Sequence, residues 1–245
     1  MQMSNIKISV VVPAYNEEKR IANCLQSLSN QNFKYPYEII LVNNASIDNT
    51  KNIAKTFSKV KIIDEPNKGV ATARQRGFTE AQGDLIASTD ADCIVPNNWL
   101  TQIYESFEND KDLIAIGGYW LFYDSHLFNI FNKFGNYINL INIIALFIDR
   151  QPLSTQNMTV KKEYFIKSGG FNTNIKSPLG LDDVDFSTRL SKFGKVKTNK
   201  NIIILTSARR FKKKPLQTTF YRLANYITYA TKNKGYGLNK DSDVR

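Results

Sequence analysis

The chain has 245 residues, of which 42% are hydrophobic and 12% aromatic, which is enough to bury the core of one large α/β domain or of two small ones. Because no run of about 20 apolar residues occurs and the start of the chain is polar, we expect neither a transmembrane helix nor a secretory signal. The two cysteines, Cys24 and Cys93, match no metal-binding spacing. We therefore expect free, buried thiols in a reducing cytoplasm.

The net charge of +11 is concentrated near the C-terminus. Residues 186–240 include 14 Lys or Arg and no Asp or Glu, which leaves 19 basic and 22 acidic residues for the rest of the chain. A near-neutral body with a strongly basic last quarter indicates an anionic partner, such as a membrane surface, a phosphate-bearing substrate or a nucleic acid.

The first 92 residues alternate between short apolar runs and amphipathic segments. We expect strands at 7–12, 38–42, 60–63 and 85–87, and helices that begin near residues 21, 48 and 69. Strands and helices that alternate at this spacing predict an α/β fold with a doubly wound, mostly parallel sheet.

The pattern is less regular after residue 92. We expect helices at 99–107, from 182 to near 194 and at 216–231, and strands at 113–123, 155–160 and 202–205. The stretch 126–147 is long and apolar and contains the only histidine, His126, which we do not expect to bind a metal. No internal repeat or low-complexity linker divides the chain, so we predict a single domain, 1–245.

Two carboxylates, Asp90 and Asp92, follow directly after the strand expected at 85–87. Residues at the carboxyl end of such a strand lie where open α/β sheets bind their ligands. Carboxylate oxygens at that edge suit Mg²⁺ or Mn²⁺, and such an ion would neutralise a diphosphate. An Asp-x-Asp pair alone is a weak signal, because surface turns contain it often.

Six segments together give the pattern more weight. They read VVPAYNEE at 11–18, NNASIDNT at 43–50, NKGVATAR at 67–74, DAD at 90–92, GGF at 169–171 and DDVDF at 182–186. In this order and spacing the chain resembles the family 2 glycosyltransferases over roughly residues 7–194. The resemblance implies the GT-A fold, with a Rossmann-like nucleotide-sugar-binding half at 1–92, an acceptor half at 93–214, and a C-terminal helix and tail at 215–245.

The resemblance places the nucleotide at the ends of the first two strands. Pro13, Ala14 and Tyr15 would border the base, and an aromatic ring beside backbone carbonyls suits a flat uracil. Asn43 stands where the family often has an aspartate that accepts the uracil N3–H. An asparagine still offers a carbonyl oxygen, so we expect UDP first, with GDP and dTDP open.

Phosphate and metal contacts are implied at the next two motifs. Lys68 and Arg74 lie at the start of a helix expected along the nucleotide, where cations and helix N–H groups favour phosphate. The resemblance gives Asp90 to the ribose or the metal, and Asp92 to the Mn²⁺ or Mg²⁺ that bridges the diphosphate.

Asp182 and Asp183 match the acidic pair of the family, and Asp183 matches the catalytic base of its inverting members. Asp183 would accept the proton of an acceptor hydroxyl as that oxygen attacks the anomeric carbon. In the simpler interpretation these acids only cap a helix. A phosphate acceptor would need no strong base. Asp182, Arg209 and Arg210 are weaker candidates for contacts to the acceptor or the diphosphate.

The implied partners are a nucleotide sugar and a glycan or lipid-linked acceptor. The apolar stretch at 126–147 together with the basic residues at 209–214 also suggests peripheral attachment to the anionic cytoplasmic face of a membrane. Packing of the apolar stretch in the core or in a dimer is the alternative.

Two other functions compete with this hypothesis. A nucleotidyltransferase would need a glycine-rich loop after the first strand, but residues 13–18 contain no glycine and two acids. A nucleic-acid-binding protein would use the basic quarter, but no recognised motif accompanies it, so we expect no nucleic acid.

Overall fold

The computed structural model describes residues 6–125, 153–175 and 181–213 of the chain. The apolar stretch at 126–147, His126 and the helix expected at 216–231 lie outside these ranges.

The described residues form a seven-stranded sheet in the order β3-β2-β1-β4-β6-β5-β7. Its strands are β1 Ile8–Ala14, β2 Tyr37–Asn43, β3 Val60–Asp64, β4 Leu85–Ser88, β5 Leu113–Phe122, β6 Met158–Lys161 and β7 Lys195–Thr206. Strands β1, β2, β3 and β4 pair in parallel, as do β5 and β7, and β6 runs antiparallel to both of its neighbours. The predicted doubly wound, mostly parallel sheet is confirmed.

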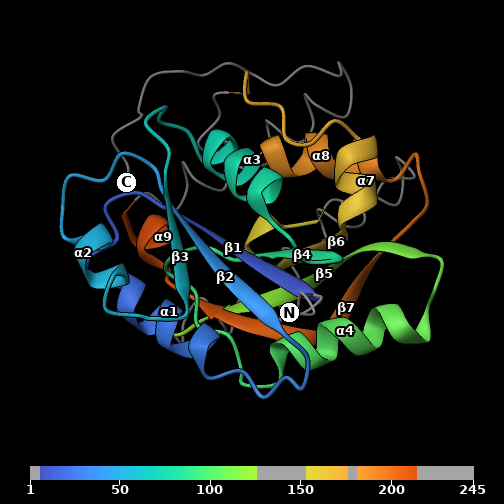
Figure 1. Cartoon of the computed structure of the whole chain (residues 1–245), viewed down its shortest axis with the longest axis horizontal. Helices are drawn as coiled ribbons and strands as arrows, with labels where there is room; N and C mark the ends of the chain where they lie inside the picture. Colours follow the sequence, from blue (N-terminus) through green and yellow to red (C-terminus); the bar gives the residue numbers. More distant parts are fainter. Residues whose placement is uncertain (1–5, 126–152, 176–180, 214–245) are drawn as a thin grey trace, which may run out of the picture.

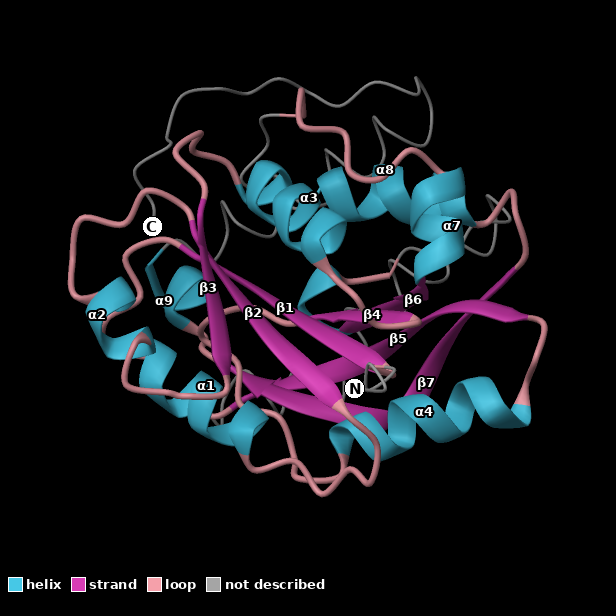
Figure 2. Ribbon diagram, in the orientation of Figure 1, coloured by secondary structure: helices cyan, strands magenta, loops and turns pink. Residues whose placement is uncertain are grey.

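Helices cover both faces of this sheet. In the described part of the chain they begin with α1 Ile21–Ser29, α2 Thr50–Ala54, α3 Val70–Glu80, α4 Trp99–Asn109 and α7 Lys162–Lys167. They are followed by α8 Leu181–Leu190 and α9 Arg209–Lys213, and a 3₁₀ turn, η1 Thr155–Asn157, precedes β6. Figure 1 shows α3, α7 and α8 on one side of the sheet and α1, α2 and α4 on the other, and Figure 2 shows the strands sandwiched between them.

Alternating side chains of the central strand divide the core into two layers. Val10 and Val12 of β1 pack into the layer that includes Leu25 and Trp99, from α1 and α4. Val11 packs into the second layer, which lies under α3, α7 and α8. All seven residues of β1 are buried, because both faces of a central parallel strand are covered.

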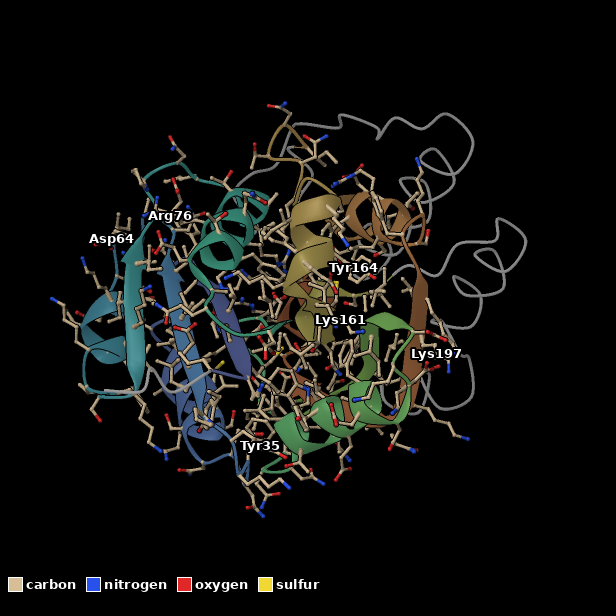
Figure 3. The ribbon with its side chains drawn as sticks, turned by 45° about the vertical axis from the view of Figure 1, so that its right-hand side comes forward. Tyr35, Asp64, Arg76, Lys161, Tyr164 and Lys197 are labelled. Atoms are coloured by element: carbon tan, nitrogen blue, oxygen red, sulfur yellow. The ribbon has the colours of Figure 1, made fainter. Side chains whose placement is uncertain are left out.

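The strand order reverses at β1. The chain runs from β1 outward to β2 and β3, and then returns to place β4 on the opposite side of β1. Open α/β sheets commonly bind ligands at such a reversal, beyond the carboxyl ends of the strands. Figure 3 labels Asp64 at this end of the molecule and Tyr35, in the loop before β2, at the opposite end.

The structure corrects several predicted elements after residue 150. The strand predicted at 155–160 begins only at Met158, because residues 155–157 form a 3₁₀ turn. Helix α7 was not predicted, since its six residues are too few to show a helical period. The strand predicted at 202–205 is the end of β7, whose first half is polar because it lies at the edge of the sheet.

Four phenylalanine rings join α3, α7 and α8 into one layer. Phe78 of α3 lies 5.0 Å from Phe171, which in turn lies 4.3 Å from Phe186 of α8, between ring centroids. Phe165 of α7 completes the cluster at 5.2 Å from Phe78. The packing fixes α8 against α3 and therefore sets the distance between the polar residues that these helices carry.

Two expectations about the whole chain can be compared with the described residues. Both cysteines are free and buried, as predicted. Within residues 6–125, 153–175 and 181–213, no helix has the length and apolar character needed to span a bilayer.

Candidate functional site

The ends of β1 and β2 bring the first predicted residues together. Ala14 and Asn43 are paired in the parallel register, and Ala14 accepts a hydrogen bond from the Asn44 N–H at 2.8 Å. The Asn43 amide group donates to an Asp64 carboxylate oxygen at 2.8 Å. Since a carboxylate only accepts, this contact fixes the orientation of the amide and leaves the buried Asn43 Oδ1 without a partner.

Asn44 holds the loop that leads into α3. Its amide nitrogen donates to the backbone oxygens of Glu65 and Asn67, and its oxygen accepts the Gly69 N–H at 2.8 Å. Gly69 has a φ of 151°, which a residue with a side chain rarely adopts. The loop places the Lys68 ammonium 3.1 Å from the Tyr15 hydroxyl and 5.0 Å from the centre of its ring.

Arg74 connects the Asp-x-Asp segment with the acidic pair at the start of α8. One guanidinium nitrogen donates to Asp90 at 2.7 Å and the other to Asp182, also at 2.7 Å. The Arg74 side chain is only 5% exposed. Burial opposes its charge, but Asp90, Asp182 and Asp183 outweigh that effect and hold the pKa of Arg74 above its ordinary value.

Asp183 lies beside Asp182 and has a different environment. Its Oδ2 accepts the Thr155 N–H at 3.2 Å, and its buried Oδ1 has no hydrogen-bond partner. Burial and the negative charge of Asp182 raise the pKa of Asp183 to about 7, although Arg74 acts in the opposite direction. A carboxyl group with such a pKa is suited to accept a proton near neutral pH.

A second guanidinium lies at Asp92. Arg209, at the start of α9, forms two hydrogen bonds with the two carboxylate oxygens of Glu17, one of them at 2.8 Å. The same Arg209 nitrogen that contacts Glu17 Oε1 is 3.1 Å from Asp92 Oδ2. Burial disfavours its charge, but the contacts with Glu17 and Asp92 raise the pKa of Arg209.

The end of β5 fixes the position of α9. Asp124 follows this strand, and its carboxylate accepts hydrogen bonds from the Ser207 hydroxyl at 2.8 Å and from the Ala208 N–H at 2.7 Å. Lys212 of α9 contacts the same residue. These contacts hold the residues immediately before Arg209 and so direct its side chain toward Glu17.

The predicted metal ligand is therefore in contact with an arginine. The described residues contain no group of three His, Cys, Asp or Glu arranged to hold a metal ion. The carboxylates of Asp92 and Glu17 nevertheless converge on one cationic nitrogen, and oxygen donors of this kind suit Mg²⁺ or Mn²⁺. The donor chemistry fits a divalent cation, and Arg209 occupies the position between the two carboxylates.

The structure brings most of the predicted residues to one edge of the sheet. Two clusters result: the first is made by the ends of β1 and β2 with the loop before α3, and the second by the Asp-x-Asp segment with α3, α8 and α9. The first cluster contains Pro13, Ala14, Tyr15, Asn43 and Lys68, and the second contains Arg74, Asp90, Asp92, Asp182, Asp183 and Arg209. The Arg210 side chain is not among those described.

Sequence reasoning missed two residues of this region. Glu17 was only part of a motif, and nothing in its local sequence indicates a partner at Arg209, which is 192 positions away. Asn44 also belonged to a motif, but its role in holding the loop at Gly69 depends on three contacts that only the fold creates. Asp182 is more than a helix cap, because its carboxylate pairs with Arg74.

Comparison with known proteins gives a consistent result. The family model described as "Glycosyl transferase family 2" matches residues 9–179, more than half of the chain. Glycosyltransferase GlyA of Streptococcus pneumoniae is 32% identical over 123 residues, which cover 49% of this chain and 18% of that protein. Glycosyltransferase AglE of Haloferax volcanii is 35% identical over 99 residues, which cover 38% of this chain and 33% of that protein. The matched part thus spans a third or less of these two relatives.

Solved structures share the fold. TarS of Staphylococcus aureus, solved as residues 1–349 with UDP-GlcNAc, has a TM-score of 0.64 at 16% identity, covering 82% of this chain and 58% of that one. The mannosyltransferase PcManGT of Pyrobaculum calidifontis, solved with GDP-Man and Mn²⁺, has a TM-score of 0.66 at 20% identity. It covers 91% of this chain and 65% of that one. These likenesses confirm the predicted GT-A fold.

The raised pKa of Asp183 has a consequence for stability. The folded state keeps a proton on this carboxyl group between the unfolded pKa of about 4 and the folded value of about 7, so its contribution to stability falls as pH rises through that window. Asp183→Asn removes this titration. We expect the difference in unfolding free energy between the mutant and the wild type to shift in favour of the mutant as pH rises. From about pH 5 to about pH 8 this shift should be on the order of 1 to 4 kcal/mol.

Urea unfolding of both proteins at about pH 5 and about pH 8 measures this shift in the free energy of unfolding. Asp185→Asn is the control, because it removes a carboxylate of the same helix that is paired with Arg189. It should show no such gain. A constant difference between Asp183→Asn and wild type at the two pH values would contradict a raised pKa.

Proposed function

The chain belongs to glycosyl transferase family 2, and from this premise we propose that it moves a sugar from a nucleotide sugar to an acceptor hydroxyl. The observation that carries the proposal is the pair of 2.7 Å contacts from Arg74 to Asp90 and Asp182. Through them the Asp-x-Asp segment and the acidic pair, which are 90 residues apart in the sequence, form one polar centre at the carboxyl edge of the sheet.

Asn43 supports a uridine nucleotide. Its buried Oδ1 is an unpartnered acceptor at the end of β2, held in place by the amide contact with Asp64. The N3–H of uracil is a donor that this oxygen can accept without a carboxylate charge. The neighbouring Tyr15 ring offers an aromatic face for the base, and the Lys68 ammonium next to it offers a positive charge for phosphate.

The departing nucleoside diphosphate develops negative charge that the site must stabilise. Asp92 would hold Mn²⁺ or Mg²⁺, and such an ion would supply Lewis-acid stabilisation of the departing diphosphate. Asp90, held by Arg74, would contact the ribose or assist at the metal. Cofactor use by PcManGT, which was solved with Mn²⁺, is consistent with this assignment.

Asp183 would act as the general base of an inverting transfer. The acceptor oxygen attacks the anomeric carbon as the bond between that carbon and the diphosphate oxygen breaks. The hydroxyl proton passes to the unpartnered Asp183 Oδ1, and the nucleoside diphosphate leaves on the opposite face of the sugar. Asp182 is paired with Arg74, and its negative charge contributes to the raised pKa of Asp183.

The proposal is tested by incubating the chain with a panel of nucleotide sugars, Mn²⁺ and glycan acceptors, and measuring release of nucleoside diphosphate. Wild type should release UDP from at least one UDP-sugar. Asp183→Asn should bind the donor normally but lose about 10²- to 10⁴-fold in rate, the usual contribution of a positioned base.

Asp185→Asn is the matched control, because it changes the same helix outside the acidic pair and should retain most of the rate. Equal rates for wild type and Asp183→Asn would exclude the base. Absence of turnover with every donor, while nucleic acid binds tightly, would favour a nucleic-acid-binding function.

We further propose that the protein reaches a lipid-linked acceptor by binding the cytoplasmic face of an anionic membrane. Among the described residues of the basic region 186–240, Lys212 and Lys213 are exposed on α9, and Lys212 is in addition paired with Asp124. Arg209 is not available for this role, because it is paired with Glu17 and Asp92. Each exposed cation near an anionic leaflet contributes about 1 kcal/mol.

Co-sedimentation with vesicles measures this attachment. The wild type should bind vesicles that contain anionic lipid, bind neutral vesicles poorly, and dissociate at high salt. The double variant Lys212→Gln with Lys213→Gln should bind several-fold less. Its matched control removes two cations elsewhere, Lys195 and Lys197, which are paired with Asp110. No binding at low salt would refute the membrane proposal and leave the glycosyltransferase proposal intact.

A further inference from the structure

One nitrogen of Arg209 lies between two buried carboxylates. It contacts Glu17 Oε1 and is 3.1 Å from Asp92 Oδ2. Glu17 is 6% and Asp92 8% exposed. An arginine does not lose its proton, so this position holds a permanent positive charge, as required to keep two carboxylates close together away from water.

The two contacts of Arg209 are not equivalent. Two nitrogens of its guanidinium donate hydrogen bonds to the two oxygens of Glu17, whereas its contact with Asp92 is an ion pair at 3.1 Å. Paired, parallel hydrogen bonds between a guanidinium and a carboxylate are the stronger arrangement. Arg209 can therefore leave Asp92 while it remains attached to Glu17.

We propose that Arg209 and a divalent cation are alternative partners of Asp92. In this proposal the diphosphate of the donor draws Arg209 away from Asp92, and the cation then binds Asp92. This inference rests on the proposed function. A cation that approaches Asp92 meets the positive charge of Arg209, and so binds weakly while Arg209 stays in place. A diphosphate offers the guanidinium a new anionic partner and removes this opposition.

Glu17 and Asp124 keep the released guanidinium close by. Asp124 binds the Ser207 hydroxyl and the Ala208 N–H immediately before Arg209, and Glu17 holds the guanidinium itself. Guanidinium groups match the geometry of phosphate oxygens and bind them through two hydrogen bonds. Arg209 therefore acts as a positioning and selectivity residue, because it makes the metal and the nucleotide bind together more tightly than either binds alone.

The experiment measures the Mn²⁺ affinity of the full chain by electron paramagnetic resonance, with and without UDP. For the wild type, UDP should raise the Mn²⁺ affinity by at least about 10-fold, within the usual range of coupling between two ligands. Arg209→Gln should bind Mn²⁺ about 10-fold more tightly than the wild type in the absence of UDP, and its affinity should respond less to UDP.

Two further variants serve as controls. Lys213→Gln removes an equal charge from the exposed side of the same helix and should behave as the wild type. Asp92→Ala should lose Mn²⁺ binding in both conditions, which shows that the resonance signal reports this site. Circular dichroism spectra confirm that each variant is folded before the titrations are compared.

Equal Mn²⁺ affinities for wild type and Arg209→Gln in the absence of UDP would overturn the inference. Because that comparison uses no nucleotide, it stays decisive even if UDP is not the donor. A second result would also overturn the inference: UDP binds the wild type in the absence of Mn²⁺ but does not bind Arg209→Gln. Arg209 would then take the place of the ion permanently. Neither result would contradict sugar transfer itself.

Discussion

The buried guanidinium of Arg74 is the interaction on which the polar centre depends. A charge with 5% exposure is tolerated in a protein only when carboxylates neutralise it, and removal of one partner of such a pair typically costs about 3 to 5 kcal/mol. Asp90 and Asp182 provide this neutralisation from two separate parts of the chain. Arg74 therefore requires that the segment after β4 and the start of α8 meet at α3, and this requirement sets the geometry of the site.

The apolar core makes that meeting possible. Gly77 of α3 lies so close to β1 and β2 that an added Cβ would come within 2.3 Å of a Val11 methyl group, so the helix lies directly on the sheet. The phenylalanine cluster then holds α8 beside α3 on the same face of the sheet. Because both contacts are apolar and tightly packed, the arginine and the carboxylates have little freedom to separate.

Local sequence patterns predicted the first part of the fold well. Strands β1 and β4 were identified because parallel strands buried on both faces are short apolar runs, and α1 and α4 because their apolar residues recur with a helical period. The ordered motifs singled out Arg74, Asp90 and Asp183, but Arg74 was predicted to contact phosphate, whereas the structure pairs it with Asp90 and Asp182. Pairing between distant residues was not predictable, since the contact of Glu17 with Arg209 depends on the course of β5, β7 and α9. For the same reason the predicted partner of Asp92 was a metal ion, whereas the structure shows Arg209 in contact with it.

We propose that Asp183, beside Asp182 and its partner Arg74, works as a base near neutral pH. The pH dependence of kcat/KM for sugar transfer measures this role, because that ratio reports the ionisation of groups in the free enzyme. We expect the rate to increase with pH through an apparent pKa of about 7 and then to level off, and this increase should be absent in Asp183→Asn. A flat profile between about pH 5 and pH 8 in the wild type would exclude Asp183 as the base.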